Sequence, residues 1–193
     1  MPTFDDARAL LVKRLRPESL GHCERVAEIA RGLAVRFGAD AERAALAGLL
    51  HDWSRDESTE ELLDFARGHG LPVSDVDRAV PYLLHAGVAA AQVSEAFPGI
   101  DPAVVDAIAS HTLGEAGMTD LMRIVYIADT VEPARTFDGV EELRRLASDP
   151  AATLAEVCFA CYRRSLMHIV DSGRRIHPDS VRAWNALVAE AGR

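Results

Sequence analysis

Signals that begin and end α-helices recur along the whole chain, and they constrain its fold more than any other feature. Pro17, Asp40 and Asp101-Pro102 are typical helix starts, and Gly38 can adopt the left-handed conformation that ends a helix. No stretch shows the sustained alternation of polar residues with β-branched or aromatic ones that is typical of half-buried strands. The sequence therefore predicts an all-α fold, a bundle of helices.

The same signals place the individual helices and give no sign of a domain boundary. The expected helices cover about 3–15, Pro17 to Gly38, Asp40 to His51, Ser58 to Gly68 or Gly70, a segment from Pro81, Asp101 to His111, Thr119 to Pro133, a segment starting near Asp138 to Glu141, Asp149-Pro150 to Gly173, and a segment from Pro178. There is no repeat, low-complexity tract or linker. We therefore expect residues 1–193 to form a single domain.

The composition argues against several functional classes. Apolar residues make up 49% of the chain, but no run of about eighteen apolar residues occurs, so we expect no membrane span. The net charge of −9, without a basic stripe, argues against nucleic acid as a partner. It allows a small phosphorylated substrate, because bound cations can supply the positive charge. The first fifteen residues lack the apolar block of a secretory signal, which predicts a cytoplasmic protein.

Three cysteines are too few and too unevenly spaced for a disulfide framework. Cys158 and Cys161 form a C-x-x-C pair, but they lie in an apolar helical pattern that favours packing in the core over a redox or zinc pair. Cys23 stands alone beside His22. We interpret it as a small packing residue.

Four histidines and two aspartates occupy helix positions whose neighbours are apolar. They are His22, His51, Asp52, His85, His111 and Asp129. Each one alone is more often a hydrogen-bonded core residue or a cap, but two buried carboxylates among imidazoles are relieved together if cations lie between them. This ligand mixture suits Zn, Mn, Fe or Co. Six groups exceed the needs of one open catalytic ion, whereas two ions bridged by a shared carboxylate would use them all.

Three sequence words narrow the interpretation. They are His111-Thr112-Leu113-Gly114, the stretch Ala128-Asp129-Thr130-Val131-Glu132-Pro133-Ala134-Arg135, and Ile176-His177-Pro178-Asp179. With the order His, His-Asp, His, His and Asp on successive helices, they make the chain resemble the HD-domain superfamily. Within it, the chain is similar to the bacterial YqeK-type hydrolases of symmetrical dinucleoside tetraphosphates. The likeness runs from about Leu20 to Val188, with departures at Leu113, usually Thr, and at Ala86-Gly87, usually Gly-Pro.

The resemblance implies an HD helical bundle that hydrolyses diadenosine tetraphosphate to two ADP. It implies a divalent metal, with iron favoured over Mn, Co or Zn, as one ion or two. By the same resemblance, the expected ligands of one ion are His22, His51, Asp52 and Asp129, and those of a second ion are His85, His111 and the far oxygen of Asp52.

The resemblance also implies residues that act on the substrate. Asp52 and Arg55 are the expected catalytic residues, and Arg55, Thr112 and Arg135 are expected to bind phosphate. For the arginines the alternative is a surface salt bridge, and for Thr112 it is a turn cap. We interpret His177 as a structural turn residue. Neither His69 nor His168 has a ligand-like context.

Other functions remain open at this point. An HD phosphohydrolase could act on nucleoside monophosphates or cyclic nucleotides, which product analysis would distinguish from release of two ADP. A di-iron oxygenase would consume O₂, and a non-catalytic nucleotide-binding module would carry a degenerate site. The last is disfavoured because all six ligand positions are filled. We expect a small-molecule nucleotide as the partner, with a homodimer left open.

Overall fold

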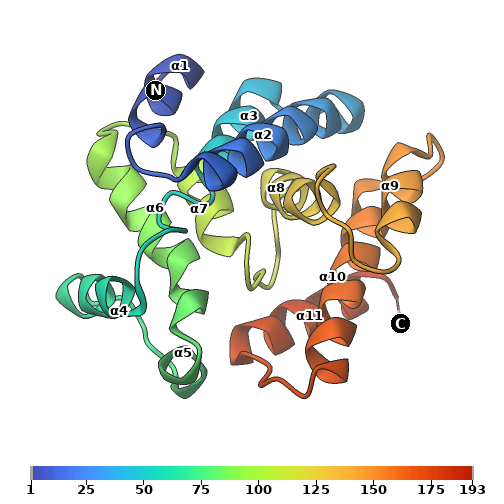
Figure 1. Ribbon diagram of the computed structural model, residues 1–193. Coiled ribbons are helices and arrows are strands. Elements are labelled where there is room, and N and C mark those ends of the chain that lie inside the picture. The colour runs from blue at the N-terminus through green and yellow to red at the C-terminus, as the bar shows by residue number, and fades with distance from the viewer. Residues whose placement is uncertain (1, 193) are drawn as a thin grey trace.

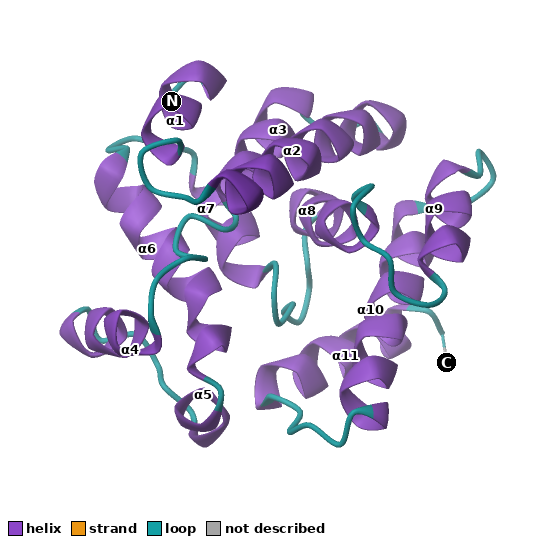
Figure 2. Ribbon diagram, in the orientation of Figure 1, coloured by secondary structure: helices purple, strands orange, loops and turns teal. Residues whose placement is uncertain are grey.

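The computed structural model describes residues 2–192, which form eleven α-helices, one 3₁₀ helix (η1) and no strand (Figures 1 and 2). The helices are α1 (Phe4–Leu11), α2 (Pro17–Phe37), α3 (Ala41–Leu50), α4 (Thr59–Gly68), α5 (Asp75–Ala79), η1 (Pro81–Leu84), α6 (His85–Ala96), α7 (Pro102–Ser110), α8 (Asp120–Val131), α9 (Val140–Ser148), α10 (Leu154–Asp171) and α11 (Pro178–Glu190). The predicted all-α fold is confirmed. Among the described residues, no helix has the length and apolar character needed to cross a lipid bilayer.

Most of the predicted helix boundaries are confirmed by their caps. Gly38 ends α2 in the left-handed conformation, with φ of 74°. Asp40 accepts hydrogen bonds from the first amides of α3, and Asp101 does the same for α7 with Pro102 in the first turn. Ser58 begins α4 as half of a capping box. These local interactions satisfy amides that have no partner inside the helix.

Two boundary predictions are wrong, and one short helix was not predicted. The first helix ends at Leu11 rather than near residue 15, and a turn follows it. Asp149-Pro150 does not open the long helix, because Thr153 and Glu156 form a capping box that starts α10 at Leu154. The five-residue helix α5 was not expected. It is a single turn held by the capping box of Ser74, too short to show a periodic pattern.

The main hydrophobic core contains buried residues from Ala7 on α1 to Leu187 on α11. Helices α2 and α3 lie side by side in it (Figure 1). A Cβ atom at Gly48 would lie 2.9 Å from Cα of Ala27, so only glycine allows this close approach of the two backbones. Cys158 and Cys161 are buried in the core, as predicted.

The fold brings several helix ends together. His51 follows the last residue of α3, His111 follows the last residue of α7, and His85 lies where η1 passes into α6. Helix α8 packs against α2, α3 and α7. The polar side chains considered next project from these positions.

Candidate metal centre

Three of the four singled-out histidines are oriented by their own helices. His51, His85 and His111 each place Nδ1 on the backbone carbonyl oxygen three residues earlier, at 2.8, 2.6 and 2.7 Å. A carbonyl oxygen has two lone pairs, so those of Tyr82 and Ile108 can accept the imidazole proton although a backbone amide also donates to them. Because a carbonyl oxygen can only accept, Nδ1 must carry the proton in all three rings.

His22 lies inside α2, where backbone carbonyls are already used, and a distant carboxylate orients it instead. Its Nδ1 lies 3.2 Å from Oε1 of Glu132, a buried residue at the end of α8. Arg25 and the backbone amide of Ala134 donate to Oε2 of Glu132 at 2.7 and 2.8 Å. Burial would raise the pKa of Glu132, but these hydrogen bonds outweigh it and lower the pKa, so the carboxylate accepts the Nδ1 proton of His22.

Glu132 was not among the residues selected from the sequence. It does stand inside the word from Ala128 to Arg135 that carried the resemblance, three residues after Asp129. A carboxylate on the far nitrogen of a ligating imidazole fixes the ring and its tautomer. The signal was therefore present, although its role depends on a contact with α2 that the sequence does not reveal.

All four Nε2 atoms converge on Asp52, whose side chain is 1% exposed. Oδ2 of Asp52 lies 3.4 Å from Nε2 of His22 and 3.2 Å from Nε2 of His51. Oδ1 lies 3.2 Å from Nε2 of His85 and 3.6 Å from Nε2 of His111. Each oxygen of this one carboxylate therefore faces a different pair of imidazoles.

Asp129 lies on the same side as the first pair. Its Oδ1 is 2.9 Å from Nε2 of His22 and 3.8 Å from Nε2 of His51. Two groups of three ligand atoms result, each within 4.8 Å of one another: His22 with His51 and Asp129, and Asp52 with His85 and His111. The structure thus brings together all six residues selected from the sequence.

The unpaired polar atoms of this cluster fit a cation. Nε2 of His22, Nε2 of His51 and Oδ1 of Asp52 are buried without a hydrogen-bond partner. With the protons held on Nδ1, the imidazole lone pairs face carboxylate oxygens, and Nε2 of His85 lies only 3.0 Å from Nε2 of His111. Such contacts repel one another unless positive charge lies between them. Neutral imidazole and carboxylate are also the donors that Zn, Mn, Fe and Co prefer.

The electrostatics keep both aspartates ionised. The guanidinium group of Arg55 pairs with Asp52, and a neighbouring positive charge favours the ionised form of a carboxyl group. Burial would raise the pKa of Asp129, but the paired guanidinium group of Arg135 opposes it, and the pKa is lowered. Two carboxylates in this environment are charged at neutral pH and suited to bind cations.

Cys23 lies next to the cluster, with Sγ near His51 and Asp52. Burial, followed by the negative charge of Asp52, raises the pKa of its thiol well above the ordinary value. Metal ligation requires the thiolate, which this environment disfavours. The expectation that Cys23 is a packing residue agrees with its complete burial in the core.

A cavity of about 230 Å³ opens above the cluster and contains the expected phosphate-binding residues. Its lining includes Asp52, Asp129, Arg55, Arg135 and Thr112. The guanidinium of Arg55 bonds to Oδ2 of Asp52, and that of Arg135 bonds to Oδ1 of Asp129. Neither arginine therefore forms the separate surface salt bridge considered from the sequence. Each guanidinium group lies at the cavity wall, paired with a candidate ligand.

Thr112 and Tyr82 complete the cavity on the side of the second histidine pair. The hydroxyl of Thr112 lies 3.2 Å from Nε2 of His85 and 3.1 Å from Nε2 of His111. The ring of Tyr82 stacks on His85 with centroids 4.5 Å apart. Tyr82 was not expected from the sequence, because only the turn of η1 brings it over the histidine three residues later.

The remaining histidines lie outside the cluster. His177 caps α11 and bonds to Ser74 and Asp77, a structural role as predicted. His69 is paired with Glu95 at 3.1 Å on the surface. His168 belongs to neither ligand group, but it lines a second hollow beside the cavity.

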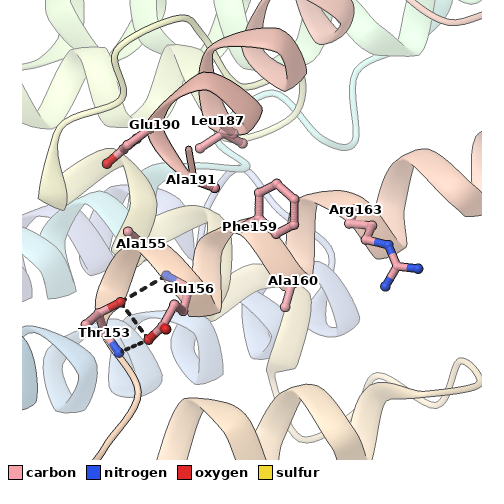
Figure 3. Close-up of a pocket in the computed structure, with 9 residues that line it drawn as sticks. All are labelled: Thr153, Ala155, Glu156, Phe159, Ala160, Arg163, Leu187, Glu190 and Ala191. Carbon is pink, nitrogen blue, oxygen red and sulfur yellow. Dashed lines mark hydrogen bonds between the residues drawn. The ribbon is translucent and has the colours of Figure 1, made fainter. Parts of the chain in front are cut away.

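A larger hollow of about 500 Å³ lies between α10 and α11 and has different chemistry (Figure 3). Phe159, Leu187 and Ala160 give it an apolar wall, and Glu156 is held in the capping box of Thr153. It contains no histidine or aspartate. The smaller cavity, with its charged and unpaired groups, is therefore the candidate site.

Comparisons with known proteins agree with this geometry. The HD domain family matches residues 19–134. The symmetrical bis(5'-nucleosyl)-tetraphosphatase of Bacillus subtilis is 31% identical over 185 residues, covering 96% of this chain and 97% of that protein. The protein of the same name from Halalkalibacterium halodurans is 30% identical, covering 95% and 96%.

A solved structure is similar over the same extent. The crystal structure of a predicted HD superfamily hydrolase involved in NAD metabolism, from Clostridium acetobutylicum, superimposes with a TM-score of 0.90 at 29% identity. The superposition covers 98% of this chain and 99% of that one. The similarities therefore extend well beyond the residues that line the cavity.

Proposed function

This chain belongs to the HD domain family, and we propose that it is a metal-dependent phosphohydrolase that cleaves diadenosine tetraphosphate symmetrically into two ADP. The resemblance predicted from the sequence words is confirmed by relatives that span nearly the whole chain. The names of these relatives support the substrate. Support for the chemistry comes from the chain's own residues.

The observation that carries the proposal is the convergence of four imidazole Nε2 atoms on a single buried carboxylate. Oxygen acceptors hold the protons of His22, His51, His85 and His111 on the outer nitrogens. The four Nε2 atoms and Oδ1 of Asp52 then carry lone pairs and no proton, so they can donate electron pairs to a cation. Such an arrangement is costly in a protein interior unless cations occupy it.

The two ligand groups suggest how cations would be held. His22, His51, Asp52 and Asp129 would bind one ion, and His85, His111 and the second oxygen of Asp52 another. We propose iron, as the resemblance implies, with Mn, Co or Zn as alternatives, since all four accept imidazole and carboxylate ligands. Divalent cations here would stabilise charge on the phosphoryl oxygens and activate a water molecule for attack.

The chain's own residues would position the tetraphosphate in the cavity. Arg55 and Arg135 can exchange a carboxylate oxygen for a phosphate oxygen, since both guanidinium groups lie at the cavity wall. Thr112 can donate its hydroxyl to the same group. Asp52 is assigned the central catalytic role because its two oxygens face both ligand groups. Water would attack an inner phosphorus in line with the central bridging oxygen, so that one P–O bond forms and the bond to the bridging oxygen breaks. One ADP leaves with the bridging oxygen, and the other ADP carries the oxygen of the water.

Two further expectations belong to this proposal. We assign the activity to one domain spanning residues 1–193, which agrees with a core that reaches from α1 to α11. We also place it in the cytoplasm, because the three cysteines are free thiols, as expected in a reducing compartment.

Product analysis tests the proposed reaction. Protein purified without added metal is analysed for bound elements and then incubated with diadenosine tetraphosphate, and the products are separated by chromatography. We expect a bound transition metal and ADP as the sole nucleotide product. ATP with AMP would contradict symmetrical cleavage. Turnover of nucleoside monophosphates or cyclic nucleotides, without turnover of the tetraphosphate, would contradict the substrate.

A further inference from the structure

A second hollow of about 290 Å³ adjoins the candidate metal centre. It shares four lining residues with the cavity described above: Asp129, Thr130, Arg135 and Ser165. It adds Phe137 from the connection between α8 and α9, and Arg164 and His168 from α10. Because the walls are shared, the hollow continues the cavity towards α10, which packs against α8. We call it the Phe137 hollow.

Phe137 is the unusual residue of this hollow, because a loop at the surface does not need a large apolar side chain. It is a large apolar residue with 36% of its surface exposed. The guanidinium of Arg164 lies 5.8 Å from the centre of its ring. Nε of Arg164 donates to the backbone oxygen of Asp138 at 2.8 Å, which ties the loop to α10 beside the ring. The aromatic ring is therefore held in place while part of it remains open to a ligand.

The polar groups around the ring complement a nucleoside with its phosphate. Thr130 and Ser165 donate their hydroxyl protons to backbone carbonyls at 2.8 and 3.2 Å. The oxygen of Thr130 is left as an acceptor, whereas that of Ser165 also contacts the side chain of Tyr126. Ribose hydroxyls and the amino group of adenine are donors that match the Thr130 oxygen. Arg135 stands where the two hollows join and can contact a phosphate that passes from one to the other.

We propose that the Phe137 hollow binds one nucleoside end of the substrate, with the base stacked on Phe137. This inference rests on the proposed function, because it takes the phosphate chain to lie at Asp52 and Asp129. A symmetrical dinucleotide cut at its centre needs room for a nucleoside on each side of the reacting phosphorus. The Phe137 hollow supplies that room on the α10 side, and His168 lies at its wall within reach of the nucleoside.

Substitution of the ring by a non-aromatic side chain tests the proposal. Phe137→Leu keeps an apolar side chain in the loop but removes the stacking surface, whereas Phe137→Trp keeps an aromatic face. Stacking of one base contributes roughly 5- to 150-fold in affinity. We expect the Leu variant to raise KM for diadenosine tetraphosphate within that range, with bound metal unchanged. The Trp variant should stay near wild type.

Two controls separate stacking from general damage. Inorganic tripolyphosphate has no base, so its inhibition constant should be equal in wild type and the Leu variant. Val170→Ala removes an exposed apolar side chain from the same helix as His168, outside the hollow, and should leave KM unchanged. Circular dichroism and thermal unfolding establish that each variant is folded. If the Leu variant does not fold, His168→Ala tests the same wall, with an expected rise in KM for the dinucleotide and none in the tripolyphosphate constant.

The outcomes distinguish this inference from the proposed function. If the wild type cleaves the tetraphosphate and the Leu variant has the same KM, the subsite is wrong and the hydrolase stands. If the wild type does not cleave it, calorimetry gives the Kd of the uncleaved compound directly. A weaker Kd for the Leu variant then supports the subsite although the reaction is wrong, and equal Kd values overturn the subsite. An equal loss of tripolyphosphate binding would also overturn stacking as the cause.

Discussion

The protein buries two clusters of histidine and aspartate, and they differ in how their protons are arranged. In the cluster around His177, the backbone amide of Asp179 donates to Nδ1 at 3.1 Å. Nε2 must therefore carry the proton, which it can donate to Asp77 Oδ2 at 3.2 Å or to Ser74 Oγ at 3.0 Å. Every polar atom of this imidazole has a partner, and the cluster links α5 to the start of α11.

At the candidate metal centre the arrangement is reversed. Nδ1 of each imidazole donates to an oxygen, and the Nε2 atoms face Asp52 and Asp129 without a proton between them. Residue types are the same in both clusters. The side of the ring that carries the proton is what separates a structural histidine from a candidate ligand.

The largest expected difference between the clusters is in bound metal. Asp52→Ala removes a carboxylate that faces both histidine pairs, so metal content and turnover should both fall. The loss should exceed the roughly 100-fold that is the upper range for removing a residue that only contacts a metal ligand. Elemental analysis and ADP release measure the two effects. Asp77→Ala, the matched change in the other cluster, should retain metal. An Asp52→Ala protein with normal metal content and turnover would refute the comparison.

Glu132 should show an intermediate effect, because it acts on the metal centre through His22. Glu132→Ala removes the acceptor for Nδ1, and we expect roughly 10- to 100-fold weaker metal affinity. Glu132→Gln keeps an oxygen that can accept, and its loss should be smaller. Competition with a chelator gives both affinities. Equal affinity in wild type and the Ala variant would mean that His22 is oriented in some other way.

The His177 cluster should instead affect stability. His177→Ala leaves the buried carboxylate of Asp77 with fewer partners and removes the cap of α11, which should lower the free energy of unfolding by about 1–3 kcal/mol. Urea unfolding in the presence of a chelator measures this without a contribution from metal. Metal content of the untreated variant should equal that of wild type. A variant that loses metal would show that the two clusters are coupled.

The smallest expected effect is the pH dependence of this stabilisation. Burial would raise the pKa of Asp77, but hydrogen bonds from Ser74 and the contact with His177 outweigh it and lower the pKa. A carboxyl group with a lowered pKa in the folded state stabilises the fold above its unfolded pKa of about 4, and the stabilisation is lost as the pH falls below that value. The stability difference between wild type and Asp77→Asn should therefore be constant above about pH 5 and narrow as the pH falls below about 4. A difference that stays constant below that pH as well would exclude this contribution.

The sequence predicted the fold and the set of clustered residues because both depend on local patterns. Helix caps such as Asp40 and Thr119 are read from neighbouring residues, and an aspartate on the apolar stripe of α8 is anomalous without any tertiary information. The wrong start of α10 has a local cause as well. Asp149 and Thr153 are competing cap residues four positions apart, and the capping box of Thr153 starts the helix.

What the sequence did not predict depends on contacts between distant segments. Glu132 meets His22 across 110 residues, and Arg55 turns towards Asp52 rather than towards the neighbouring Asp56, which caps the start of α2 instead. Phe137 lines a hollow only because residues of α10 lie beside its loop, which the sequence does not reveal. Periodicity describes which face of a helix is buried, but it does not say which helix covers that face.

The attachment of three imidazoles to backbone carbonyls has a consequence for how this site tolerates mutation. No side-chain substitution can delete the oxygen that orients His51, His85 or His111, because it is part of the peptide chain. Of the four histidines, His22 is the one oriented by a side chain, that of Glu132, which a single amino-acid change removes. A single mutation at Glu132 would therefore disturb the orientation of a candidate ligand while leaving all six candidate ligands in the sequence.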